Sequence, residues 1–375
     1  ATNNIQKGIL KMATVSAKML SPSGSNLSTS KTIDTEKRTR LTVTRNSNPW
    51  IYSNYPEAIG KNGKGLALAE NGYFLNQQTI SGTAEVFYSH TNYTGKRLYV
   101  GIQAYNSSSK SVTVTCQNYG DSSGWYKSIN AVKNFFSSKK TSVTIASGKA
   151  AWIATSQAIP ADSSTPFTGM CRFETSGSVV VTVYAYQSTS AVDGNAVAFP
   201  YGLSYSADKS INHTYPAVYS GKGTGYYLTF THGTKYVSDL LSRPYIYTSN
   251  AQGGYGNSNE MIPIKMIQGG LTADPNSSND DLNNLGNWCA HNYNTITFKN
   301  NTSKTYTIHG YVGSAGTCQV MNLGGNVQAA NLLDGLKTWR WWEITLAPND
   351  TCSFDWQHIV ASYGVGASSH EWSVD

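Results

Sequence analysis

The segment IQAYNSSSKSVTV (Ile102–Val114) returns 194 residues later as ITFKNNTSKTYTI (Ile296–Ile308). In each copy, apolar residues alternate with polar ones on both sides of a short Asn/Ser/Thr/Lys stretch. This alternation is typical of β-strands with one face in water, and the polar stretch is typical of the turn that joins two such strands. The pair therefore predicts a β-hairpin that is present twice in the chain.

Four more segments recur in the same order, with offsets that drift from 187 to 201. They are Leu41–Thr44 with Leu228–Thr231, Pro49–Tyr52 with Pro244–Tyr247, Asn134–Phe136 with Asn331–Leu333, and Val143–Gly148 with Ile344–Asn349. Collinear repeats of this length indicate an internal duplication. We predict an all-β fold of two tandem duplicated antiparallel β-sandwich domains, with one short helix in each, at Ser128–Phe136 and Asn326–Leu333.

The repeats also divide the chain into parts. We expect an N-terminal extended arm at residues 1–31, a first sandwich at 32–190, a connector at 191–217 and a second sandwich at 218–375. After its last repeated segment the first copy has three further strands, at Ala150–Ile159, Thr168–Thr175 and Ser178–Tyr186. The second copy has room for two, at Cys352–Val360 and Ser369–Val374, so its sandwich is predicted to lack one strand.

Charge is scarce and unevenly placed. Only 13% of the 375 residues are charged and the net charge is +7, of which residues 1–45 carry +6. After Arg340 the chain has acidic residues and no Lys or Arg. Nucleic-acid binding needs a basic face on a folded domain, so we expect no nucleic-acid partner. No window approaches 18 apolar residues, and no membrane span is predicted.

The strands VFYSH…RLYVGIQAYNSSSKSVTV and TSGSVVVTVYAY resemble β-rich regions of secreted and cell-surface proteins of Gram-positive-type bacteria, which are mostly of unassigned function. The resemblance covers about a third of the chain and implies a secreted, cell-surface location and a β-sandwich fold. It brings no active site. The start at Ala1, without an apolar signal core, is also what a processed secreted protein would show.

No catalytic signature is present. The seven histidines match no mechanistic spacing, and we expect His90 and His291, which follow similar aromatic runs, to share a structural role. No carboxylate pair stands out as a glycosidase pair. The five cysteines fit no metal motif and are predicted mainly as core thiols, with Cys116–Cys171 and Cys318–Cys352 as the first candidates for a bridge. We predict that the protein is not an enzyme and needs no cofactor.

Two weaker binding sites remain open. The loop residues Asp274, Asn276, Asp280 and Asp281 offer the oxygen ligands that calcium prefers, although such residues are also common in turns. Trp339 and Trp341 alternate along a strand and would share one face, either exposed for stacking on sugar rings or buried in a core or an interface.

The arm is too apolar for a tail in water. Its residues fit a helix or a strand, and as a strand they place Ile9, Ala13, Val15, Ala17 and Met19 on one face. An open sheet edge is a template for another strand, so we expect the arm to complete the second sandwich. The recipient is predicted to be a neighbouring copy, which would give a head-to-tail homopolymer, with closure within one chain as the rival.

Three function classes follow from these observations. The first is an extracellular structural protein, a surface filament or layer subunit that polymerises through strand exchange of its arm. The second is a secreted, non-catalytic adhesin that binds polysaccharide, and an enzyme is the third. A low-charge surface rich in Tyr, Asn, Ser and Thr favours the first, because few ionic groups need to lose water on contact.

Overall fold

The structure of the protein is a computed structural model. It describes residues 15–374 except 42, 55–57, 60–71, 125–127, 162–165, 187–219, 250–263, 268–281, 285–287, 314–315, 317, 333–334 and 362–367. Strands make up most of this part of the chain, in three sheets, with α-helices at α1 (Ser128–Ser137) and α2 (Val237–Ser242). The predicted all-β fold with few helices is confirmed.

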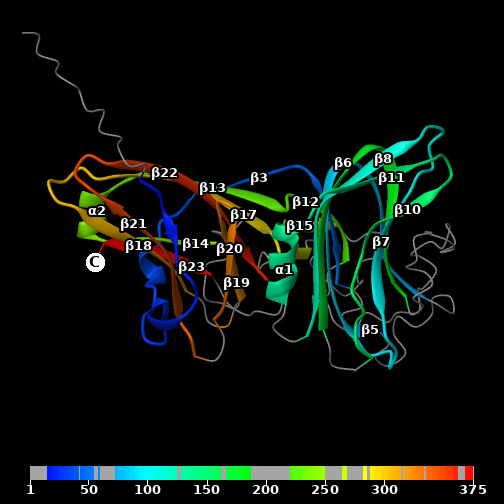
Figure 1. The fold of residues 1–375 in the computed structure, drawn as a ribbon, viewed down its shortest axis with the longest axis horizontal. Coiled ribbons are helices and arrows are strands. Elements are labelled where there is room, and N and C mark those ends of the chain that lie inside the picture. The colour runs from blue at the N-terminus through cyan, green and yellow to red at the C-terminus, as the bar shows by residue number, and fades with distance from the viewer. Residues whose placement is uncertain are drawn as a thin grey trace, which may run out of the picture.

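The sheets form two bodies that lie side by side along the long axis (Figure 1). The N-terminal body is one sheet of eleven described strands. Its main path is β10 (Ala150–Thr155), β7 (Tyr99–Tyr105), β11 (Pro166–Tyr186), β6 (Gly72–Asn92), β4 (Pro49–Ser53), β12 (Ser220–Thr224), β15 (Ile264–Ile267) and β16 (Leu282–Asn284). Off this path, β5 (Ala58–Ile59) pairs with β6, and β8 (Val112–Ser123) pairs with β11 and β9 (Thr141–Ile145).

The C-terminal body consists of two packed sheets, each with six described strands. Sheet A contains β1 (Lys18–Met19), β2 (Leu27–Ser28), β21 (Thr338–Leu346), β18 (Tyr306–Gly313), β23 (Ser369–Val374) and β14 (Tyr245–Thr248). Sheet B contains β20 (Asn326–Asn331), β19 (Cys318–Leu323), β22 (Thr351–Val360), β17 (His291–Lys299), β13 (Tyr227–Tyr236) and β3 (Val43–Arg45). Large aromatic side chains fill the space between them, as in the contact between Trp356 and Trp372, whose ring centroids lie 5.8 Å apart.

Strand register shows the duplication directly. β8 pairs with β9 as β18 pairs with β21, and β7 pairs with β10 as β17 pairs with β22. The repeated segments align residue for residue in these ladders: Val112 opposite Ile145 matches Tyr306 opposite Leu346, and Tyr105 opposite Ala150 matches Lys299 opposite Thr351. The sequence repeat is therefore a repeat of strand pairing.

The same asparagine-centred turn closes both hairpins. Asn300 is fully buried, and its amide Nδ2 donates to the carbonyl oxygens of Lys304 (2.8 Å) and Leu346 (2.9 Å) while its Oδ1 accepts from Thr302 N (3.0 Å). Asn106 makes the equivalent contacts, with Nδ2 donating to the carbonyl oxygens of Lys110 (2.7 Å) and Ile145 (2.9 Å). The N-x-S/T sequence at these asparagines is thus a turn motif whose amide group is already occupied.

Several expectations about element boundaries are wrong. Residues Asn326–Leu333 were expected to be helical, but Asn326–Asn331 form β20, because Gly324 and Gly325 both adopt positive φ and close a hairpin with β19. The two strands expected at Thr168–Thr175 and Ser178–Tyr186 are one strand, β11. The first half of β11 pairs with β8 and its second half pairs with β7. Because β11 joins the strands that were expected to form two separate sheets of a sandwich, the N-terminal body has a single sheet.

The domain limits at 32–190 and 218–375 do not match sheet membership. β3 lies within the first range but pairs with β13 of sheet B, whereas β12 lies within the second range but pairs with β4 of the N-terminal body. Helix α1 also lies between the bodies and contacts β19 and β20 (Figure 1). Pairing depends on which edges are open in the folded chain, so sequence order alone did not reveal this exchange.

The two adjacent asparagines of the second turn provide a matched test. Asn300→Ala leaves a buried carbonyl and an amide N–H without partners, so we expect the free energy of unfolding to fall by about 3 kcal/mol. Asn301, whose contacts to Ser238 lie on the surface, serves as the control. Asn301→Ala should change the free energy of unfolding by about 0.5 kcal/mol or less. Urea unfolding followed by tryptophan fluorescence measures both, and equal effects would contradict the buried-turn assignment.

Candidate functional site

Residues 15–45, here called the strap, bind the C-terminal body although the N-terminal body separates the two in sequence. β1 and β2 both pair antiparallel with β21, Lys18 opposite Glu343 and Leu27 opposite Trp339. Leu20 N donates to Trp341 O (2.8 Å), and Lys337 N donates to Ser28 O (2.8 Å). The strap therefore covers the outer edge of β21, and in this structure it does so within one chain. The expectation that the second copy lacks a strand is wrong, because β11 is a single strand and each copy has two strands after its last repeated segment.

Beyond β2 the strap runs past β18 and β23 to the opposite edge of sheet A. The ammonium group of Lys31 lies 2.8 Å from Glu371 Oε1 and 4.3 Å from the ring centroid of Tyr311. Ile33 is buried, and a Cβ added at Gly313 would lie 2.9 Å from Ile33 Cδ1, so the two surfaces fit closely. Thr39 N then donates to the carbonyl oxygen of Ile246 in β14, and β3 enters sheet B.

The alternation expected for the arm is present where the structure describes it. Val15, Ala17 and Met19 are half-buried while Ser16 and Lys18 are exposed, and Val15 and Met19 pack against the core of the C-terminal body. Cys352 Sγ donates to Val15 O (3.3 Å). Ile9 and Ala13 lie outside the described residues.

Ion pairs join the basic start of the chain to its acidic end. Lys18 Nζ lies 3.5 Å from Glu343 Oε1, in addition to the pair between Lys31 and Glu371. Lys18 is largely exposed and its pair adds little, whereas Glu371 is nearly buried and Lys31 is its counterion. Burial of Leu20 and Ile33 accounts for more of the binding, at roughly 1.5–3 kcal/mol per fully buried side chain.

The tryptophan pair does not form a sugar platform. Trp339 and Trp341 are both fully buried, as is the neighbouring Trp342. A bulge opposite Gly310 and Tyr311 breaks the alternation of β21 at this point, so neighbouring tryptophans all reach the interior. The exposed alternative considered for these two residues is therefore wrong, and the buried one is correct.

The calcium candidates Asp274, Asn276, Asp280 and Asp281 lie outside the described residues. Within the described part of the chain, no group of three or more His, Cys, Asp or Glu side chains is placed to hold a metal ion. All five cysteines are buried; Cys116 Sγ and Cys171 Sγ lie 3.8 Å apart as thiols, and Cys318 and Cys352 donate to other groups.

A buried charged cluster, which the sequence analysis missed, joins the two bodies. Arg172 donates through Nε and Nη2 to Glu85 Oε2 (3.2 and 3.0 Å), and His291 Nε2 lies 2.8 Å from Glu85 Oε1. Glu85 and Arg172 face each other across β6 and β11, while His291 belongs to β17. Both carboxylate oxygens are occupied and Glu85 has no exposed surface, so its carboxylate serves as a contact between the bodies.

The signal for this cluster was present in the sequence, because AEVFYSH and GMCRF each place one charged residue, Glu85 and Arg172, inside an apolar strand. The equivalence expected between His90 and His291 is wrong. Strand register aligns His291 with Arg97, and His90 Nε2 contacts Ser53 Oγ (3.2 Å) inside the N-terminal body.

His232, His358 and His370 are also buried in the C-terminal body. His232 lies between Tyr245 Oη (3.0 Å) and Asn294 Oδ1 (2.9 Å), and His358 contacts His370 with ring centroids 4.8 Å apart. Burial lowers the pKa of His232 to about 4 and that of His358 to about 3. Burial, with the nearby His358 and His232, also places the pKa of His370 well below its usual value, so all three are neutral at pH 7.

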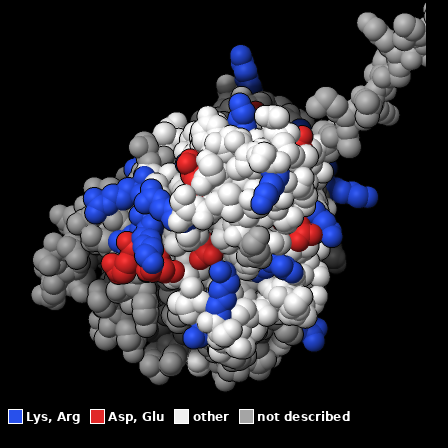
Figure 2. All heavy atoms as spheres, turned by 90° about the vertical axis from the view of Figure 1, so that its left-hand side faces the viewer, with Lys and Arg blue, Asp and Glu red and all other residues white. Residues whose placement is uncertain are grey.

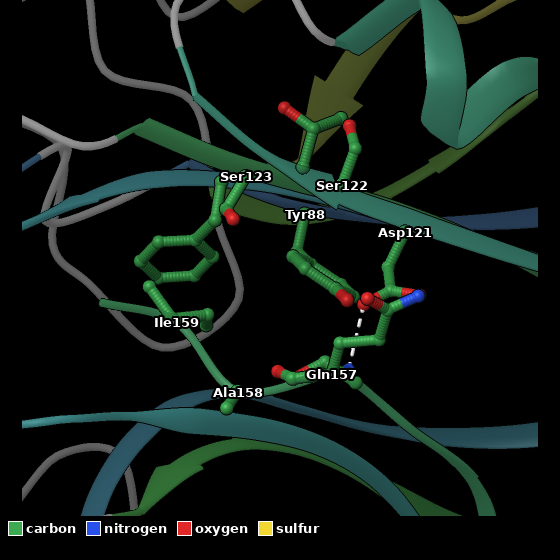
Figure 3. Close-up of a pocket in the computed structure, with 10 residues that line it drawn as sticks. Tyr88, Asp121, Ser122, Ser123, Gln157, Ala158 and Ile159 are labelled. Carbon is green, nitrogen blue, oxygen red and sulfur yellow. Dashed lines mark hydrogen bonds between the residues drawn. The ribbon is translucent and has the colours of Figure 1, made fainter.

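The polar cavity in Figure 3 is small. Tyr88, Asp121 and Gln157 are among the residues around a volume of about 20 Å³, which is room for about one water molecule. Asp121 Oδ2 accepts from Gln157 N (2.8 Å), and burial raises the pKa of the Asp121 carboxyl. This cavity has no room for a substrate.

No known protein family and no curated protein matches the chain. Among solved structures, a cupin 2 conserved barrel domain protein from Leptotrichia buccalis shares 8% identity over 91% of this chain and 92% of that chain, with a TM-score of 0.13. A salicylate 1,2-dioxygenase from Pseudaminobacter salicylatoxidans shares 7% over 91% and 88%, also with a TM-score of 0.13. At TM-scores this low, neither carries an argument about fold or activity.

The neutral histidines predict acid sensitivity. An unfolded histidine takes up a proton below about pH 6.5, whereas folded His232 and His358 do so only near pH 4 and pH 3, so stability that is present above pH 6.5 is lost as the pH falls. From pH 7.5 to pH 5 we expect a loss of about 2 kcal/mol for each such histidine. Urea unfolding at the two pH values measures it. His358→Gln should reduce the difference, and a stability that does not change with pH would contradict the assignment.

Proposed function

We propose that the protein is a non-catalytic, secreted structural subunit that assembles head to tail by exchanging the strap between copies. The observation that carries this proposal is that the strap completes both sheets of the C-terminal body from the far end of the chain. Residues 227–374 alone leave the edge of β21 open, and an open edge accepts an equivalent strand from any copy.

For the strap to move from its own chain to a neighbouring copy, the short link that joins it to the N-terminal body must change direction. Asn46–Asn48 connect β3 of the C-terminal body to β4 of the N-terminal body. Asn46 N donates to Tyr227 O (3.0 Å) at this crossing. If the link opens outward, the strap of one copy makes on its neighbour the contacts it now makes on its own chain. Such a contact joins unlike surfaces, so it propagates into a filament unless the rotation closes a ring.

The surface suits close contact between copies. The end of the C-terminal body in Figure 2 is largely uncharged, with Lys and Arg side chains scattered over it and one group of basic and acidic side chains at its left edge. A surface of this kind has few charges to desolvate. In the described part of the chain no helix is long and apolar enough to cross a membrane, and the secreted location is part of the proposal, supported by the resemblance to cell-surface proteins.

Two variants, each with one cysteine added to the five buried native ones, test exchange without disrupting the fold. Lys18 and Glu343 are directly opposite in the ladder between β1 and β21 and are both accessible. The Lys18→Cys and Glu343→Cys proteins are mixed, unfolded and refolded together under reducing conditions, and then mildly oxidised. A strap of one copy that lies on another holds the two added thiols opposite each other, so the disulfide between them should form well above the level of random collision. We expect a disulfide-linked dimer of the two variants on non-reducing gels.

The double variant K18C/E343C in one chain extends the test. It should give a ladder of linked species if exchange propagates, and a closed monomer if the strap stays on its own chain. Lys304→Cys, an exposed turn position, replaces Glu343→Cys as the control for random collision. The proposal is overturned if the double variant gives only monomer and if the mixture of single variants gives no more dimer than the control.

A further inference from the structure

The outer face of sheet B contains an open groove that the strap does not use. It has a volume of about 510 Å³ and lies over β13, β17 and β22. A bulge between Thr231 and Thr234, with Gly233 at φ +70°, shifts β13 relative to β17 and shapes one side of it. Among the described residues β3 pairs with β13 at residues 228–230, and the groove lies over the following residues of β13.

An aromatic stack runs from the interior to this groove. The ring of Tyr227 stacks on buried His291 at 6.2 Å and on Tyr293 at 5.6 Å, with interplanar angles of 20° and 27°. Tyr293 is partly exposed and lines the groove. Its position is fixed by Tyr227 on one side and by its hydroxyl group, which donates to Asp355 Oδ2 (2.6 Å). The ring is therefore held rigidly at the surface.

Hydroxyl groups and one carboxylate surround this ring. Register places Thr231, Thr295 and Asp355 in one row across the sheet, and Thr234, Thr297 and Ser353 in the next. Thr297 Oγ1 and Ser353 Oγ lie 2.7 Å apart. The lining residues include no Lys or Arg. A partly exposed aromatic ring beside a carboxylate acceptor and hydroxyl groups of both donor and acceptor type matches the alternating apolar and hydroxyl surfaces of a sugar ring.

We propose that this groove binds a segment of a neutral polysaccharide. Tyr293 would stack on the C–H face of one sugar ring, Asp355 would accept hydrogen bonds from sugar hydroxyls, and the Thr and Ser side chains would bond the adjoining ring. The site is independent of the proposed assembly, because an exchanged strap supplies an identical β3 and leaves sheet B unchanged. It also lies on a different sheet from Trp339 and Trp341.

Affinity gel electrophoresis of the full chain tests the proposal, with hydroxyethyl cellulose and dextran as neutral polysaccharides and carboxymethyl cellulose as an anionic one. We expect at least one neutral polysaccharide to retard the protein, and the anionic chain to bind more weakly than its neutral counterpart because of Asp355. Tyr293→Ala should weaken binding at least tenfold and Asp355→Asn should also weaken it, whereas Tyr293→Phe, which keeps the ring, should lose less than Tyr293→Ala.

Thr307→Val with Thr345→Val is the matched control, because these residues form a similar exposed hydroxyl pair, 2.9 Å apart, on sheet A. The control should bind like the wild type. Unchanged thermal unfolding midpoints for Tyr293→Phe and Asp355→Asn would show that the variants are folded. The proposal is overturned if no neutral polysaccharide in the set retards the protein, or if Tyr293→Ala and Asp355→Asn bind as tightly as the wild type.

Discussion

The outer edge of β21 has backbone N–H and C=O groups that need partners, and the strap provides them. Strands at a sheet edge attract any extended segment, and proteins normally cover or pair them. Here the cover comes from residues that precede the whole N-terminal body in sequence. The chain must therefore bring its two ends together before sheet A is complete, and the ion pair between Lys31 and Glu371 lies across that closure.

The junction between the bodies is a second consequence of this arrangement. The strap enters sheet B as β3, and the chain then continues into the N-terminal body as β4. Two strands that follow each other in the sequence therefore belong to different bodies. Their apolar contacts belong to one core cluster that includes Trp50, Phe135 and Phe298. The Glu85 carboxylate is paired with Arg172 inside the N-terminal body, and His291 of the C-terminal body bonds its second oxygen. A buried polar atom left without a partner is costly, so the contact with His291 favours one relative orientation of the bodies.

Local patterns predicted much of the strand structure. The hairpins around Asn106 and Asn300 follow from alternation on both sides of a polar turn, and β23 begins and ends where the sequence analysis placed its strand. The helix expected at Asn326–Leu333 failed because Gly324 and Gly325 favour a hairpin more strongly than the following residues favour a helix. Alternation places Trp339 and Trp341 on one face but cannot tell whether that face is exposed, and the structure buries it. The bulge in β21 brings Trp342 to the interior as well.

By itself, then, the sequence determined the all-β class and the duplication with its hairpin registers. These depend on residues close together in the chain, where period-two alternation and turn residues act directly. Only the tertiary structure decided that β3 and β12 each pair with the other body, that Glu85 meets His291, and that Tyr293 stands beside Asp355 at a groove. Those contacts depend on which sheet edges and faces meet after folding. The residues that form them are far apart in the sequence, so no local sequence pattern predicts the pairing.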